Sequence, residues 1–146
     1  MNRIPLNALG VTITRVTLGI VLIAHSAYLK GVVFTLPGTA AFFASIGLPG
    51  WLAYVVFVIE TVAGAMLVVG WQSRAAAVAI VPVLLGATWA HWSAGWLFTN
   101  SGGGWEYPAL LAVLAVAQAF LGYASYALKF SGLRGGGNRH IADLPA

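Results

Sequence analysis

The sequence predicts an all-α integral membrane protein, a four-helix transmembrane bundle with a short interfacial helix in the first outer loop. Composition is the first support, because 60% of the 146 residues are hydrophobic and 7% are charged, whereas a soluble globular domain carries about 25% charged residues. Four separate segments also approach the ~20 mostly apolar residues that a spanning helix needs. Finally, the cations that flank these segments lie mainly on one side of the predicted membrane.

Each predicted span carries few polar residues. The first contains Arg15 and His25, and the second contains Glu60 as its single charge. The third ends near His91, and Gln118 is the most polar residue of the fourth. In order, the predicted spans cover residues 9–29, 51–69, 75–92 and 108–128.

The distribution of cations assigns the N-terminus, the second loop and the tail to the cytoplasm, because the opposite side holds Lys30 alone. We therefore expect a multi-pass protein of the bacterial inner (plasma) membrane with both termini in the cytoplasm. A signal peptide over the first span is the less favoured alternative, since Arg15 interrupts the apolar core that such a peptide needs. The cytoplasmic cations are Arg3, Arg74, Lys129, Arg134 and Arg139.

The first outer loop, residues 31–50, is itself apolar. We expect Thr39 to cap a short helix that ends near Gly47 and Pro49. This helix is too short to span, so it is expected to lie in the membrane interface over the bundle. The predicted organisation is one membrane domain, residues 1–128, followed by a flexible Gly- and Arg-containing cytoplasmic tail, residues 129–146.

Composition excludes several chemistries. The chain has no cysteine, which excludes disulfides, thiolate catalysis and cysteine-ligated zinc or iron–sulfur clusters. Its net charge of +4 comes from seven scattered cations and three acids, so we expect no nucleic-acid partner. Redox chemistry would have to use a bound cofactor, a diffusible quinone or a partner protein.

Two opposite charges are predicted near the middle of the bundle. Arg15 and Glu60 lie at similar predicted depths, and small residues share their helix faces. A charge in the hydrocarbon costs ~2.5–3.5 kcal/mol on insertion scales, so we expect the two side chains to pair directly or through water. The pair would either lock two helices together or have a functional role. A protonated Glu60 is the third alternative.

Further polar residues collect near the outer ends of the spans. His91 points away from a stripe of tryptophans, so we expect it to face inward, near His25. One interpretation is an aromatic belt with polar helix ends. The sharper hypothesis is a shallow pocket for a quinone head group, lined by His25, Lys30, His91, Glu106 and Tyr107. Axial ligation of haem b by the two histidines is a weaker alternative, because nothing in the sequence supplies an orienting partner. We expect no metal site.

Several short motifs follow one another along residues 11–128. They are the segments 25–30 (HSAYLK), 34–39 (FTLPGT) and 47–49 (GLP), Glu60 followed by Gly64, the turn 70–74, and the segment 103–108 (GGWEYP). In the order and spacing of these motifs, the sequence resembles the DoxX family of small bacterial and archaeal membrane proteins. One departure is that many members have His-Gly with a lysine four residues after the histidine, whereas Ser26 and a five-residue spacing to Lys30 occur here.

The resemblance implies a four-helix membrane fold and a role in redox or oxidative-stress physiology. The leading hypothesis is a quinone-interacting or accessory subunit of a membrane oxidoreductase system. The alternatives are a non-enzymatic anchor or assembly factor for a soluble partner enzyme, and a small transporter or proton pathway. Expected partners are membrane lipid, a quinone, and a soluble redox enzyme or a second copy of the chain. The site residues that the resemblance implies are Arg15, His25, Lys30, Glu60, Arg74, Glu106 and Tyr107.

Overall fold

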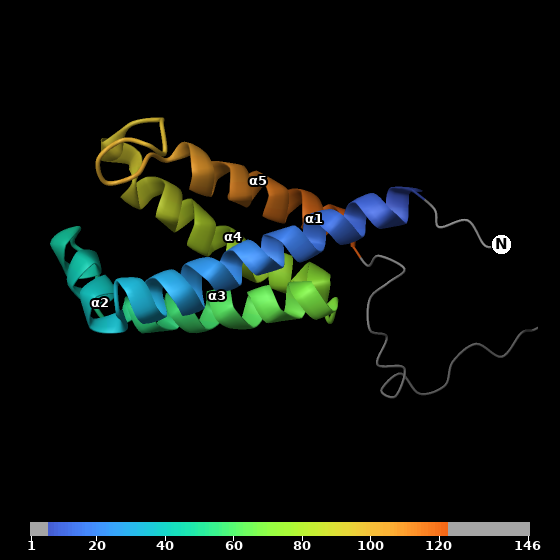
Figure 1. Cartoon of the computed structure of the whole chain (residues 1–146), viewed down its shortest axis with the longest axis horizontal. Coiled ribbons are helices and arrows are strands. Elements are labelled where there is room, and N and C mark those ends of the chain that lie inside the picture. Colours follow the sequence, from blue (N-terminus) through green and yellow to red (C-terminus); the bar gives the residue numbers. More distant parts are fainter. Residues whose placement is uncertain (1–5, 123–146) are drawn as a thin grey trace, which may run out of the picture.

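The computed structural model describes residues 6–122, and every regular element within that range is helical (Figure 1). This confirms the predicted all-α class. The expected tail, residues 129–146, and the last part of the fourth predicted span lie outside the described residues. The elements are α1 (Leu6–Ile23), η1 (Ala24–Val33), α2 (Leu36–Ser45), α3 (Leu52–Val69), α4 (Ser73–Ala90), η2 (Trp92–Ala94) and α5 (Glu106–Leu121).

Three of these helices are long and apolar enough to cross a membrane, namely Leu6–Val33, Leu52–Val69 and Ser73–Ala90. They coincide with the first three predicted spans. Helix α5 is also apolar but has 16 described residues, which extend over about 24 Å at the α-helical rise. A helical membrane bundle is therefore the architecture of the described chain.

The first long helix changes its winding part of the way along. After Ile23 it continues as the π-helix η1, whose hydrogen bonds join residues five apart. At its end, for example, the Phe34 N–H donates to the Leu29 carbonyl oxygen at 2.8 Å. In such a helix, residues five apart lie on adjacent turns, as His25 and Lys30 do. π-Helical turns are rare and occur frequently at functional sites.

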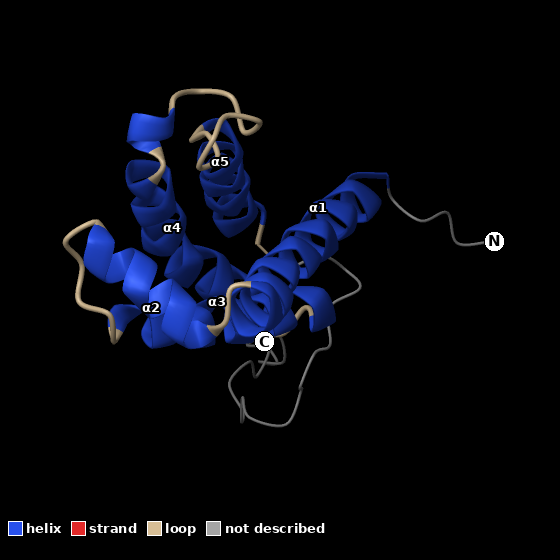
Figure 2. Cartoon of the chain, turned by 60° about the vertical axis from the view of Figure 1, so that its left-hand side comes forward, coloured by secondary structure: helices blue, strands red, loops and turns tan. Residues whose placement is uncertain are grey.

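Helices α1 and α3 are antiparallel and approach each other at two glycines. A Cβ atom added to Gly19 would lie 2.7 Å from the Gly64 carbonyl oxygen. One added to Gly64 would lie 2.9 Å from the Gly19 carbonyl oxygen. Small residues allow membrane helices to approach this closely. Helices α4 and α5 form the second packed pair, shown side by side in Figure 2, and α3 also packs against α4.

The bundle has two different ends. Helix α2 and the loop of residues 91–105 lie at one of them, which we call the lid end (left in Figure 1). The start of α1, the turn between α3 and α4, and the end of α5 lie at the other (Figure 1). We call that one the arginine end, because Arg15 and Arg74 bind helix termini there. That the lid end faces outward stays a prediction.

Helix α2 begins one turn earlier than we expected. Its cap is Thr35, whose hydroxyl oxygen accepts a hydrogen bond from the Gly38 N–H at 3.2 Å. The expectation that Thr39 is the cap was therefore wrong. Pro37 lies in the first turn, where the backbone nitrogen needs no intrahelical partner, so the helix can include it. Thr39 is buried, and its hydroxyl donates to the Thr35 carbonyl oxygen at 2.9 Å.

Candidate functional site

Arg15 and Glu60 have different partners, in place of the direct pair that we expected. The Glu60 carboxylate forms a salt bridge with the Lys30 ammonium group. Arg15 instead donates from Nη1 to the carbonyl oxygens of Leu67 and Val68. The cause is the register of α1 and α3. Because Gly19 faces Gly64, Arg15 lies one turn further along α3, about two turns from Glu60.

Arg15 acts as a cap on the C-terminus of α3. The last carbonyl groups of a helix have no intrahelical donor, and a cation there interacts favourably with the helix dipole. The Arg15 side chain is 2% exposed, and its Nε has no hydrogen-bond partner among the described residues. Arg74 does the same for another helix, because its Nε donates to the Ala119 carbonyl oxygen in the last turn of α5 at 3.0 Å. Both arginines therefore connect neighbouring helices.

Glu60 belongs to a polar cluster of four side chains at the contact between η1 and α3. The carboxylate is buried, whereas the Lys30 side chain is 19% exposed. Beside this ion pair, the Thr61 hydroxyl donates to Ser26 Oγ at 3.0 Å. The Ser26 hydroxyl in turn donates to the Leu22 carbonyl oxygen at 2.9 Å. The polar cluster consists of Ser26, Lys30, Glu60 and Thr61.

The two membrane histidines share one arrangement. In each, Nδ1 lies 3.0 Å from the carbonyl oxygen four residues earlier, that of Val21 for His25 and of Ala87 for His91. A carbonyl oxygen can only accept a hydrogen bond, so Nδ1 carries the hydrogen. In the neutral ring, Nε2 is then the acceptor. No hydrogen bond to either Nε2 is found within residues 6–122. Both imidazoles can therefore offer Nε2 to a ligand.

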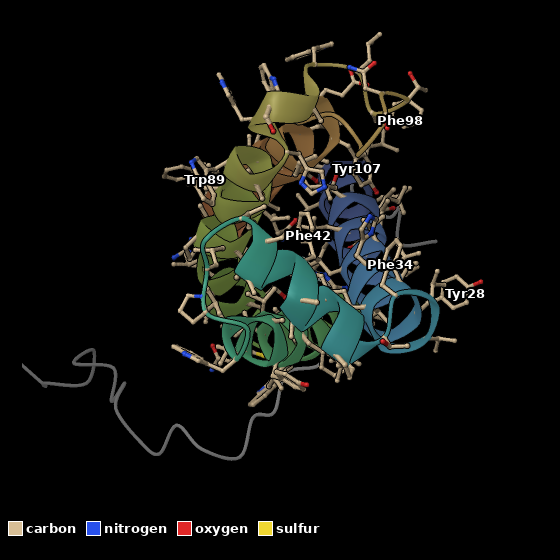
Figure 3. All side chains as sticks on the ribbon, turned by 90° about the vertical axis from the view of Figure 1, so that its left-hand side faces the viewer. Tyr28, Phe34, Phe42, Trp89, Phe98 and Tyr107 are labelled. Carbon is tan, nitrogen blue, oxygen red and sulfur yellow. The ribbon has the colours of Figure 1, made fainter. Side chains whose placement is uncertain are left out.

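Each histidine ring contacts a different aromatic ring at the lid end. The His25 ring stacks on Tyr107 of α5, with centroids 5.4 Å apart and an interplanar angle of 29°. The His91 ring lies 6.3 Å from that of Phe42 in α2. Figure 3 shows Phe42 and Tyr107 directed toward the middle of the lid end, from opposite sides. The lid end thus contains two ring contacts, His25 with Tyr107 and His91 with Phe42.

Glu106 binds the loop that precedes α5. Its Oε1 accepts a hydrogen bond from the Phe98 N–H at 2.9 Å. Beside it is a shallow, open hollow of about 300 Å³ lined by Trp96, Phe98, Glu106, Tyr107 and Leu110. Tyr107 therefore contacts both His25 and this hollow. Trp105 holds the loop together, since it stacks on Trp92 and makes an edge contact with Trp96.

The structure thus divides the predicted pocket residues into four groups. His25 and Tyr107 meet directly, Lys30 joins Glu60, His91 lies against Phe42, and Glu106 joins the loop. Sequence reasoning missed Thr61 and gave Phe42 no role. Thr61 directly follows Glu60 in the sequence, and this position could have marked it as a candidate. No group of three metal-ligating side chains occurs in the described part of the chain. The haem alternative stays a prediction.

These features define a helical membrane protein with a histidine-containing polar site at one end of its bundle. The family model named DoxX matches residues 10–92, which is more than half of the chain, and the protein belongs to the DoxX family. The matched region includes His25, Lys30, Glu60 and His91 and ends before α5.

One curated relative gives a further comparison. The chain is 35% identical over 80 residues to the Bacillus subtilis (strain 168) protein named "Putative oxidoreductase CatD". The alignment covers 54% of this chain and 57% of that protein, so the chain spans just over half the length of this relative. No solved structure matches the chain.

Proposed function

We propose that the protein is a quinone-interacting subunit of a membrane oxidoreductase system, and that it binds the quinone head group at the lid end, beside His25 and Tyr107 and beneath α2. The main support for this proposal is the stacked pair of His25 and Tyr107. In this pair, Nδ1 of the imidazole forms a hydrogen bond with the Val21 carbonyl oxygen. The word oxidoreductase in the name of the B. subtilis relative supports the redox class.

The chemistry of the site suits a planar ring with two oxygen substituents. Aromatic side chains offer a stacking surface for such a ring. The Tyr107 hydroxyl can donate a hydrogen bond to a quinone oxygen, and the Nε2 of neutral His25 can accept one from a quinol hydroxyl. Lys30 belongs to the same π-helix as His25, and Glu60 of α3 forms a salt bridge with Lys30. Charged groups that could exchange a proton are therefore close to the proposed site.

Quinone retention by the purified protein tests the proposal. Protein extracted gently and incubated with a decyl-substituted benzoquinone should retain it. His25→Ala and Tyr107→Leu should each lower the apparent affinity by about tenfold, the equivalent of one lost hydrogen bond or stacking contact. Tyr28→Phe is a matched control, because Tyr28 is an exposed tyrosine of the same π-helix.

The comparison must use equal amounts of folded protein, judged by a monodisperse elution profile. The anchor alternative predicts that the wild-type protein retains no quinone. That result, or equal retention by wild type and His25→Ala, would contradict the proposed function.

A further inference from the structure

The hollow beside α5 combines one carboxylate with aromatic walls. Trp96, Phe98 and Tyr107 supply the aromatic surfaces, and Glu106 supplies the charge. The edge contact between Trp96 and Trp105, with centroids 4.4 Å apart, fixes the position of the Trp96 wall. The hollow therefore has aromatic walls and a single acidic side chain.

The charge of Glu106 has no cationic partner among residues 6–122. The one ion pair of that region joins Lys30 to Glu60, so the lysine at the lid end is already engaged. The hydrogen bond from the Phe98 N–H to Oε1 ties the loop to α5, and an acid in the first turn of a helix is favourable in itself. Those two roles explain the position of Glu106, but they explain neither the aromatic walls nor the uncompensated charge.

Aromatic faces next to a carboxylate attract an organic cation. Ammonium groups bind over the faces of Trp, Tyr and Phe, and such groups of rings recognise choline-type ligands. Leu110 and Phe98 extend the hollow with exposed apolar surface. In a membrane, phospholipids with an ethanolamine or choline head group present such a cation next to apolar chains.

We propose that this hollow binds the ammonium head group of a zwitterionic phospholipid of the ethanolamine or choline type. Glu106 provides the counter-charge, Trp96 and Tyr107 provide the aromatic walls, and Leu110 contacts the apolar part of the lipid. Because Tyr107 belongs to both proposed sites, the lipid proposal is tested at Glu106 and Trp96, which are not part of the proposed quinone site.

Competition between lipids tests the assignment. The full chain is reconstituted in nanodiscs that contain equal amounts of phosphatidylethanolamine and phosphatidylglycerol, then partly delipidated, and the retained lipids are counted by native mass spectrometry. We expect phosphatidylethanolamine in excess. Glu106→Gln keeps an oxygen acceptor for the Phe98 N–H but removes the charge, and it should reduce this excess about tenfold. Phosphatidylcholine in place of phosphatidylethanolamine should show the same excess over phosphatidylglycerol.

Two further variants keep the test decisive. Trp96→Leu removes one aromatic wall and should also reduce the excess, whereas Trp71→Leu, an exposed tryptophan at the arginine end, should leave it unchanged. Retention of phosphatidylglycerol as strong as that of phosphatidylethanolamine would overturn the proposal, as would an unchanged excess in Glu106→Gln. If Glu106→Gln does not fold, an unchanged excess in Trp96→Leu overturns it.

Discussion

At the scale of single residues, the charged side chains within the described helices have partners that suit their chemistry. Arg15 and Arg74 bind backbone carbonyl oxygens at helix C-termini, where a guanidinium group can satisfy acceptors that the helix leaves open. The counter-ion of Glu60 is Lys30. The sequence identified Arg15 and Glu60 as interior residues, because charges in membrane helices face the bundle. It could not identify the partners, since the register of two helices depends on the glycine contact between them.

The pairing of Lys30 with Glu60 predicts a rescue in a double mutant. Removing one member of a buried ion pair leaves an unpaired charge and costs about 3–5 kcal/mol, whereas replacing both members with apolar residues is often close to neutral. Lys30→Met and Glu60→Met should each lower the folded yield in detergent, and the double variant should recover most of it. The double variant Arg15→Met with Glu60→Met is the matched control and should show no recovery. If the folded yield recovers in that control instead, Arg15 and Glu60 would be the direct pair.

At the scale of elements, apolar segment length predicts the long helices well. The predicted spans 51–69 and 75–92 correspond to α3 and α4 with small shifts at their ends. The π-helix could not be predicted in this way, because hydrophobic periodicity reports which residues face the core but not which hydrogen bonds form between turns. The five-residue spacing from His25 to Lys30 was its one trace in the sequence, and i→i+5 bonds make these residues neighbours on adjacent turns.

The contact between α1 and α3 predicts opposite effects for two glycine substitutions. Gly19→Ala places a Cβ atom 2.7 Å from a backbone oxygen of α3, and overpacking of this kind costs about 1–3 kcal/mol. Gly86→Ala lies within α4 with nothing within 4 Å of the added atom, and it should gain up to about 1 kcal/mol of helix stability. Thermal unfolding in detergent should therefore show a lower midpoint for the first variant and an equal or higher one for the second. A lower midpoint for both, by similar amounts, would contradict the close approach at Gly19.

At the scale of the whole molecule, the two ends of the bundle have different chemistry. The arginine end carries guanidinium groups that cap helices. The lid end carries α2 (Figure 3), His25, His91 and the contacting tryptophans Trp92, Trp96 and Trp105. The positive-inside rule predicts that the arginine end faces the cytoplasm. This division could be predicted from the sequence, because cations and aromatic residues segregate along the chain. The division of the pocket residues into four groups could not, since it depends on the directions of individual side chains.

Reporter fusions test this orientation. A reporter that is active outside the cytoplasm should be active when inserted after Gly38, near the start of α2, and inactive when fused after Ala146. A reporter that is active in the cytoplasm should give the opposite pattern at both positions. Activity of the external reporter at the C-terminus would invert the bundle and place the histidine site at the cytoplasmic face.

Quinone binding beside His25 and Tyr107 can be measured most directly by photolabelling the reconstituted full chain with an azido-benzoquinone, followed by peptide mapping by mass spectrometry. We expect labelled peptides from η1 and from the start of α5, the elements that carry these two residues, with labelling suppressed by excess unlabelled quinone. Absence of competable labelling, or competable labelling confined to the arginine end, would contradict quinone binding at this site.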